Sequence, residues 1–299
     1  MRSANNAAML RRTALVVSFG LLTTALACSS SSGENACTAD GAALSVCSKG
    51  PTVAGVDVSY YQGNVDWTAV KKAGKVFAIA RVSDGTGFTD PDFQKNWKGM
   101  KAAGLIRGVY QFFRPNQDPI AQADLLLSEL KAAGGLETDD LQPVMDMEVS
   151  GGLGPSAIQA NMQKWLTYVE GKTGRKPIIY TAAFMSGNVG TGFVKYPLWV
   201  ANYGVSCPTM PSNWTQWVMW QSGSTGSVAG ISGNVDVNVF NGTLADLKKF
   251  IDPTPPVAPD AGAPPSDAGS GGRDAQPTPG TDSGTDGGTL PGPVDPCKP

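Results

Sequence analysis

The 299-residue sequence predicts an α/β fold, an irregular (β/α) TIM-like barrel with eight strands and fewer helices in its second half. Eight short apolar, β-branched or aromatic runs lie between residues 52 and 251, and such runs are typical of buried strands. Helical patterns separate the early runs, as parallel strands joined by crossover helices require. The later connections, 182–197, 203–216 and 222–234, show no helical period. The expected strands are Val53–Val58, Val76–Val82, Ile106–Phe113, Pro143–Glu148, Pro177–Thr181, Leu198–Asn202, Trp217–Gln221 and Val235–Phe240.

Five segments carry the signals of helices and helix ends. The first begins with an N-cap acid, the second and third end at glycines, and the fourth is amphipathic. The expected helices are Asp66–Ala73, Asp92–Ala103, Pro119–Ala133, Ser156–Gly171 and Leu244–Phe250. Because the parallel strands of a closed barrel present their carboxyl ends at one mouth, we expect the functional side chains there.

The start of the chain has the pattern of an export signal. Arginines precede an apolar run, 13–27, that is too short to span a bilayer and ends in small residues. Cys28 and the serines after it resemble a bacterial lipoprotein signal, in which the cysteine carries the lipid. We therefore expect residues 1–27 to be a signal peptide and Cys28 to be the lipidation site. The protein would be exported and anchored to the membrane of the bacterial cell envelope, or secreted if Cys28 is not lipidated.

Three further segments follow the expected signal. Residues 28–51 are interpreted as a Ser-rich tether with a small Cys loop, and residues 52–251 as the barrel. Residues 252–299 hold more than half of the 22 prolines and no aromatic residue. Such a segment cannot bury enough apolar surface to offset its ordering entropy, so we expect a disordered Pro/Gly/Asp/Thr-rich tail.

Cysteine pairing is left open by the sequence. An exported chain favours disulfides. Cys37 and Cys47 are near enough in sequence to close a small loop, but spacing does not decide the pairing. The cysteines after Cys28 are Cys37, Cys47, Cys207 and Cys297.

The composition excludes several kinds of chemistry. The chain has no histidine, which removes Ser-His-Asp and Cys-His nucleophilic systems and His-based zinc sites. No CxxC pair exists either, so we expect no metal and no cofactor. The barrel segment is close to neutral, which gives no electrostatic reason for nucleic-acid binding. We expect a monomer whose hydrolytic chemistry, if present, rests on carboxylates.

Two carboxylates lie two residues apart at the end of an apolar run. Asp146 and Glu148 would project from one face of a strand end, roughly 6–7 Å apart. Asp57 ends the first run and Asp236 begins the last, and these two runs are neighbours in a closed barrel. Four carboxylates facing one mouth repel one another and cost desolvation energy. This arrangement favours a functional site over a structural one.

Aromatic residues from other strand ends are numerous enough to line a groove at this mouth. Most aromatic residues at such positions belong to the core, but together these fit a surface that stacks on sugar rings. The candidate substrate-binding residues are Tyr110, Tyr180, Trp199, Asn202, Tyr203 and Trp220.

These features together resemble glycoside hydrolase family 25, the Chalaropsis-type lysozymes. The similarity covers about 190 residues, and its motifs occur in family order. The matching motifs are Gly55-Val56-Asp57-Val58-Ser59, Gln62-Gly63, Asp66-Trp67, Asp90-Pro91-Asp92-Phe93, Ala103-Gly104-Leu105, Gly108-Val109-Tyr110, Asp146-Met147-Glu148, Arg175-Lys176-Pro177-Ile178-Ile179-Tyr180-Thr181, Tyr196-Pro197-Leu198-Trp199-Val200-Ala201, Trp220-Gln221 and Val235-Asp236-Val237-Asn238.

The resemblance implies a peptidoglycan hydrolase that cleaves the β-1,4 bond between N-acetylmuramic acid and N-acetylglucosamine. Glu148 would be the general acid/base, with a pKa raised by neighbours that stay ionised. Asp146 would be the nucleophile or would orient the N-acetyl group of the substrate. Asp57 and Asp236 would complete the acidic floor. Family behaviour implies retention of configuration, which the expected carboxylate separation does not decide.

Two departures from the family pattern are expected to lie near the mouth. Gln111 stands where the family usually has His, and Asp84 stands where it usually has Glu. They keep open an alternative, a catalytically impaired glycan-binding cell-wall module. A family 18 chitinase is disfavoured because Leu141 and Val144 stand where its motif requires acids. A purely structural lipoprotein does not explain four clustered acids.

Overall fold

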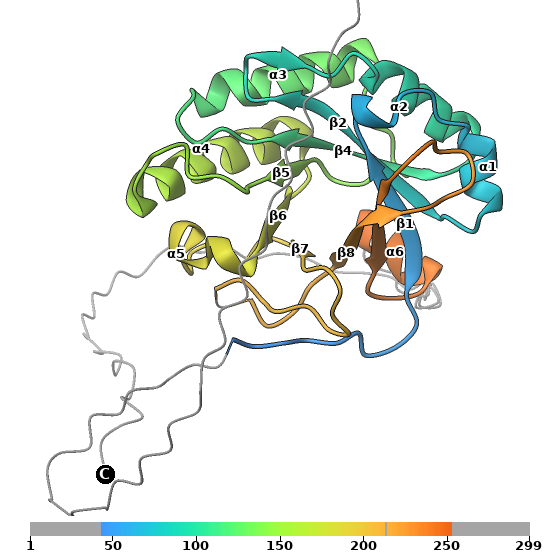
Figure 1. The fold of residues 1–299 in the computed structure, drawn as a ribbon. Helices are drawn as coiled ribbons and strands as arrows, with labels where there is room; N and C mark the ends of the chain where they lie inside the picture. The colour runs from blue at the N-terminus through green and yellow to red at the C-terminus, as the bar shows by residue number, and fades with distance from the viewer. Residues whose placement is uncertain (1–42, 213, 253–299) are drawn as a thin grey trace, which may run out of the picture. The chain divides into compact units, whose positions relative to one another are not determined.

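The computed structural model describes residues 43–212 and 214–252 (Figure 1). The expected signal peptide (1–27), the lipidation site Cys28 and the tail beyond Asp252 lie outside the described residues. None of the helices within the described ranges is long and apolar enough to cross a membrane.

Nine strands in the described part of the chain form one sheet, and eight of them close into a barrel. Around the barrel the order is β1-β9-β8-β7-β6-β5-β4-β2, and β1 pairs with β2 to close it. The short β3 pairs with the end of β2 alone. The predicted eight-stranded barrel is therefore confirmed. The strands are β1 (Val53–Val58), β2 (Phe77–Asp84), β3 (Phe88–Thr89), β4 (Ile106–Phe112), β5 (Val144–Asp146), β6 (Ile178–Ala182), β7 (Leu198–Ala201), β8 (Met219–Gly226) and β9 (Val235–Phe240).

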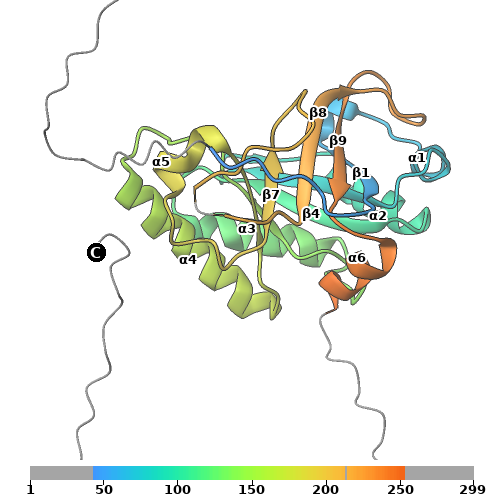
Figure 2. The same cartoon turned by 90° about the horizontal axis from the view of Figure 1, so that it is seen from below.

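The last strand runs against the others, which the sequence did not indicate. β9 is antiparallel to both β8 and β1, and Figure 2 shows it between them. Because of this direction, the amino end of β9 lies at the mouth with the carboxyl ends of the parallel strands. The register pairs Asp57 with Asp236 directly, which confirms that these two acids are neighbours.

The longer helices belong to the first half of the barrel (Figure 1). The predicted scarcity of helices in the second half is confirmed. The structure adds α5 and the 3-10 helix Ala183–Met185 within 182–197, where no helix was expected. Both are too short to produce a helical period in the sequence. The α-helices are α1 (Trp67–Lys72), α2 (Phe93–Ala102), α3 (Pro119–Ala132), α4 (Pro155–Thr173), α5 (Ser186–Val189) and α6 (Leu244–Ile251).

Apolar side chains fill the lower part of the barrel. Phe77 and Ile79 of β2 are fully buried there with Val144, Ile178 and other inward-facing residues. Gly55 makes room for this packing, because a Cβ at that position would lie 2.4 Å from the Phe77 ring. The barrel interior is thus filled at its base, and it opens at the mouth.

A disulfide fastens the segment before β1 to the connection between β7 and β8. Cys47 is bonded to Cys207, 160 residues away in the sequence. Beside it, the Val46 N–H donates to the Pro208 carbonyl at 3.0 Å. The small loop closed by Cys37 and Cys47, which the spacing allowed, is therefore not formed. The bond instead restrains the connection that follows Tyr203.

Candidate active site

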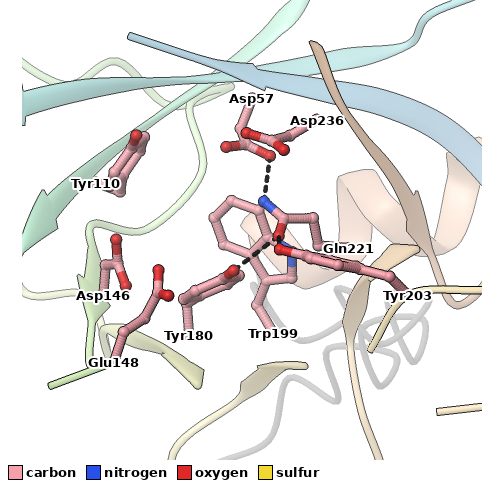
Figure 3. A pocket seen from close by; sticks show the side chains of 9 residues that line it. All are labelled: Asp57, Tyr110, Asp146, Glu148, Tyr180, Trp199, Tyr203, Gln221 and Asp236. Carbon is pink, nitrogen blue, oxygen red and sulfur yellow. Dashed lines mark hydrogen bonds between the residues drawn. The ribbon is translucent and has the colours of Figure 1, made fainter. Parts of the chain in front are cut away.

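A pocket opens at the mouth of the barrel (Figure 3). Its wall is made by strand ends and by residues just after them, which is where barrel enzymes place their catalytic groups. Nine residues from both halves of the chain contribute. The lining residues are Asp57, Tyr110, Asp146, Glu148, Tyr180, Trp199, Tyr203, Gln221 and Asp236.

The structure brings all four predicted acids together in this pocket. Figure 3 shows them as two pairs, Asp57 with Asp236 and Asp146 with Glu148. Asp57 and Asp146 are only 4% and 5% exposed. No set of three or more His, Cys, Asp or Glu side chains among the described residues has the arrangement of a metal site. The pocket is therefore acidic, and two of its four carboxyl groups are almost fully removed from water.

The predicted aromatic wall is only partly present. Two candidates, Asn202 and Trp220, do not line the pocket. The Asn202 side chain accepts a hydrogen bond from the Thr209 N–H at 2.8 Å, and Trp220 Nε1 donates to the Asn202 carbonyl at 2.8 Å. Along β8 the side chains alternate, so Gln221 faces the pocket and its neighbour Trp220 does not. The candidates that do line the pocket are Tyr110, Tyr180, Trp199 and Tyr203.

Two amide side chains that the sequence reading missed hold Asp57 in place. Gln221 Nε2 and Asn238 Nδ2 donate to the same Asp57 oxygen at 2.8 and 2.7 Å. Asn238 is fixed in turn, because Trp199 Nε1 donates to its Oδ1 at 3.0 Å. Asn238 lies two residues after Asp236, so the two side chains share one face of β9. This alternation of a strand could have predicted Asn238 as a site residue from the sequence.

Gln221 also organises two tyrosine hydroxyls. Tyr180 donates to Gln221 Oε1 at 2.7 Å, and Tyr203 donates to the same oxygen. Burial raises the pKa of both hydroxyls, so they stay protonated. With their protons directed at Gln221, the tyrosine oxygens remain acceptors for ligand O–H or N–H groups.

The Asp57–Asp236 pair shares about one negative charge near neutral pH. Burial, helped by the Asp236 charge, raises the pKa of Asp57 to about 8. The two amide hydrogen bonds oppose this rise without cancelling it. Burial raises the pKa of Asp236 to about 6, with the hydrogen bond from Asp57 acting against the rise. Asp57 therefore keeps its proton at a pH where Asp236 has lost its own.

The Asp146–Glu148 pair also retains a proton. Burial raises the pKa of Asp146 well above its usual range, and the charge of Glu148 and their shared hydrogen bond raise it further. Burial likewise raises the pKa of Glu148, while the hydrogen bond with Asp146 lowers it. The expected rise for Glu148 is present, but its cause is burial rather than ionised neighbours. The less buried Glu148 thus presents to the pocket a carboxyl group that shares a proton with its neighbour.

Gln111, expected near the mouth, points away from the pocket. It follows the inward-facing Tyr110, so its own side chain faces the helices and is fully buried. Its Nε2 donates to Ser83 Oγ at 2.7 Å, and its Oε1 accepts from Trp165 Nε1 at 2.7 Å. The role of Gln111 is to join the barrel to α4.

Asp84 does not line the pocket either. It ends β2 and forms a two-pronged ion pair with Arg114, in which Nε donates to Oδ1 at 2.5 Å and Nη2 to Oδ2 at 2.7 Å. The carboxylate is therefore occupied by a cation. Neither departure from the family pattern alters the residues that line the pocket.

Comparisons with known proteins agree with this geometry. A family model, glycosyl hydrolases family 25, matches residues 56–231. The chain is 37% identical over 207 residues to the uncharacterized protein YegX of Escherichia coli, which covers 67% of this chain and 74% of that protein. It is 39% identical over 208 residues to Lysozyme M1 of Streptomyces globisporus, which covers 65% and 70%.

A solved structure shows the same fold. The bacterial lysozyme from Streptomyces coelicolor matches with a TM-score of 0.64 and 37% sequence identity. The match covers 68% of this chain and 98% of that chain. The sequence match, the shared barrel and the acids at its mouth agree, and the chain belongs to glycosyl hydrolases family 25.

Proposed function

We propose that the chain is a peptidoglycan hydrolase, a lysozyme of the Chalaropsis type. It cleaves the β-1,4 bond between N-acetylmuramic acid and N-acetylglucosamine in peptidoglycan glycan strands. The observation that carries this proposal is the Asp146–Glu148 pair, a buried and a half-buried carboxyl group that hold a proton beside a tyrosine-lined pocket. Relatives named lysozyme and N,O-diacetylmuramidase support the same substrate class.

In the proposed mechanism, Glu148 gives a proton to the glycosidic oxygen as the bond to the leaving sugar breaks. Asp146 stabilises the oxocarbenium-like transition state, either as the nucleophile or by orienting the N-acetyl group of the substrate. The second role suits its Oδ1, which is buried without a hydrogen-bond partner and is available to an amide N–H. Water then attacks with Glu148 as the base, which retains the anomeric configuration.

Asp57 and Asp236 form the floor of the pocket in this proposal. Asp236 carries charge at neutral pH and stabilises the developing positive charge of the sugar ring. Asp57 keeps a proton, and the amides of Gln221 and Asn238 fix its orientation. Since one chain supplies every lining residue, we propose that the protein acts as a monomer.

Purified cell walls provide the test of this function. The wild-type chain should clear a turbid wall suspension and release new reducing ends that belong to muramic acid, as borohydride labelling and mass spectrometry identify them. Reducing ends on N-acetylglucosamine would instead identify a glucosaminidase. Binding to the walls without any new reducing end would favour the alternative, an impaired glycan-binding module, although the positions of Gln111 and Asp84 remove the original reason for it.

We also propose that the protein is exported and held at the cell envelope by lipid on Cys28. Cys28→Ala should move the protein from the membrane fraction to the soluble exported fraction, because the thioether-linked lipid provides the anchor. Immunoblotting of the two fractions checks this, with Cys297→Ala as the matched control that stays with the membrane. A wild-type protein already found in the soluble exported fraction would contradict the anchor and indicate plain secretion.

A further inference from the structure

A buried arginine surrounded by aromatic rings lies beside the acidic pocket. The Arg81 guanidinium carbon is 5.1 Å from the ring centroid of Tyr60, 5.6 Å from that of Tyr61 and 5.4 Å from that of Phe88. We name these four residues the Arg81 cage. Tyr61 is 73% exposed and Phe88 38% exposed, so two of the rings present apolar surface to solvent.

The cage is one strand away from the pocket wall. Arg81 on β2 is directly paired with Tyr110 on β4, and Tyr110 lines the pocket. Arg81 shares the inward face of β2 with Ile79, two residues earlier, which is part of the barrel interior. Neighbouring strands are about 4.8 Å apart. A substituent on a sugar that occupies the pocket is long enough to cover this distance.

Arg81 has hydrogen-bond donors that the protein does not use. Its side chain is only 10% exposed. Its Nε donates to Asp90 Oδ2 at 3.1 Å, and the same oxygen accepts from the Tyr60 N–H. Its Nη2 is buried and has no hydrogen-bond partner. The charge is paired with Asp90, but a buried donor without an acceptor costs free energy, and a ligand that accepts from Nη2 would recover that free energy.

The charge of Arg81 also balances the acidity of its surroundings. Its positive charge lowers the otherwise raised pKa of Asp146 and Tyr110. The pocket alone would repel an anionic ligand, because four carboxyl groups line it. The planar guanidinium group matches a carboxylate with two parallel hydrogen bonds. Arg114, on the same side of the mouth, already gives its Nε and Nη2 to the Asp84 carboxylate.

We propose that the Arg81 cage is a subsite for a carboxylate carried on the glycan, next to the sugar that occupies the pocket. The exposed rings of Tyr61 and Phe88 offer a stacking surface for the sugar ring that bears it. This inference rests on the proposed function and refines its substrate class. In such a substrate the carboxylate belongs either to the lactyl group of muramic acid or to the stem peptide attached to it.

Three glycans separate these possibilities. The first is peptide-free glycan with free lactyl carboxylates, the second is the same glycan with its carboxylates converted to neutral methylamides, and the third bears intact stem peptides. We expect the wild type to show about ten-fold higher kcat/KM on the free acid than on the methylamide, through KM, which is the usual effect of a charged hydrogen bond. Arg81→Met should remove this preference, and Arg81→Lys should keep part of it.

The peptide-bearing glycan identifies the source of the carboxylate. A rise in KM for Arg81→Met on this glycan assigns it to the stem peptide, whereas an unchanged KM assigns it to the lactyl group. Arg114→Met is the matched control, since it removes a paired arginine from the same side of the mouth, and it should leave the preference intact. Tyr61→Ala, at a mostly exposed side chain, should raise KM on both peptide-free glycans equally.

Two results would overturn the subsite. One is a wild type that cleaves acid and methylamide equally well, together with an Arg81→Met variant whose KM on the peptide-bearing glycan is unchanged. The other is an Arg81→Met variant that cleaves all three glycans more slowly than the wild type by the same factor. If Arg81→Met does not reach the wild-type melting temperature, Arg81→Gln and Arg81→Lys make the same comparison. Calorimetric binding of the two peptide-free glycans to Glu148→Gln protein measures the preference without cleavage. If the protein cleaves no glycan but still binds the free-acid glycan more tightly than the methylamide, the proposed function is contradicted and the subsite is supported.

Discussion

Glu148→Gln is expected to slow wall hydrolysis by about 10²–10⁴-fold, the usual contribution of general acid catalysis. The substitution keeps the shape and polarity of the side chain but removes the proton that the leaving sugar oxygen must receive. Glycan binding should be retained, because the other pocket residues are unchanged. Initial rates of reducing-end release, with calorimetric binding to a peptide-free glycan, measure the two effects separately.

The same variant should change the pH dependence of the rate. An acid catalyst is active only while protonated, so the wild-type rate should fall as pH rises through the pKa of the Asp146–Glu148 pair. Burial raises the pKa of both groups, which places this fall above the ordinary carboxyl range. In Glu148→Gln the residual rate should lack this limb. Glu170→Gln on α4, outside the pocket, is the matched control and should behave as the wild type.

Two outcomes would contradict the role of Glu148. A Glu148→Gln variant that clears walls as fast as the wild type would exclude it as the acid. A variant that is slow but keeps the wild-type pH profile would assign the ionisation to another group. Asp57, with a pKa of about 8, is then the next candidate, and Asp57→Asn would test it.

The sequence predicted those parts of the fold that follow from the burial of the strands and from the closure of the barrel. Eight buried strands within about 200 residues leave few arrangements other than a barrel, and closure alone makes the first and last strands neighbours. This is why the pairing of Asp57 with Asp236 was predictable from residues almost 180 positions apart. The direction of β9 was not predictable, because a short apolar strand has the same pattern in either direction.

The differences between the expected and the observed pocket lining arise from the phase of strand alternation. At the end of a strand, a shift of one residue exchanges the inward and outward faces. Gln221 faces the pocket and its predicted neighbour Trp220 does not, whereas the predicted Tyr110 faces the pocket and its neighbour Gln111 does not. Hydrophobicity does not resolve this phase, since both faces of a covered barrel strand are buried.

The disulfide and Arg81 were missed for different reasons. Cys47 and Cys207 are brought together by the route of the chain around the barrel, which leaves no local signal. Arg81 follows a run of apolar residues in β2, where a single basic residue is usually explained by an ion pair. Asp90 supplies that pair, but the unused Nη2 and the three surrounding rings are visible only in the structure.

Asp146→Asn is the variant with the second largest expected effect, a rate loss of about 10²–10³-fold, as for removal of one electrostatic contact to the transition state. Asparagine keeps the size of the side chain, but it carries no charge and cannot act as a nucleophile. Asp139→Asn, at an exposed carboxyl outside the pocket, is the matched control and should leave the rate unchanged. An Asp146→Asn rate within two-fold of the wild type would exclude both proposed roles of this residue.

The same substitution should not destabilise the fold, and its effect on stability should depend on pH. The pKa of Asp146 is raised in the folded protein, so the unfolded chain releases this proton first as pH rises above about 4. Wild-type stability from this group is therefore complete at acid pH and decreases as pH rises toward the folded-state pKa. Asparagine removes the titration, so the melting temperature of the variant relative to the wild type should increase from pH 4 to pH 8 in a differential scanning series. A relative melting temperature that falls over this range would mean that Asp146 is stabilised as an anion, and its proton could not then be shared with Glu148.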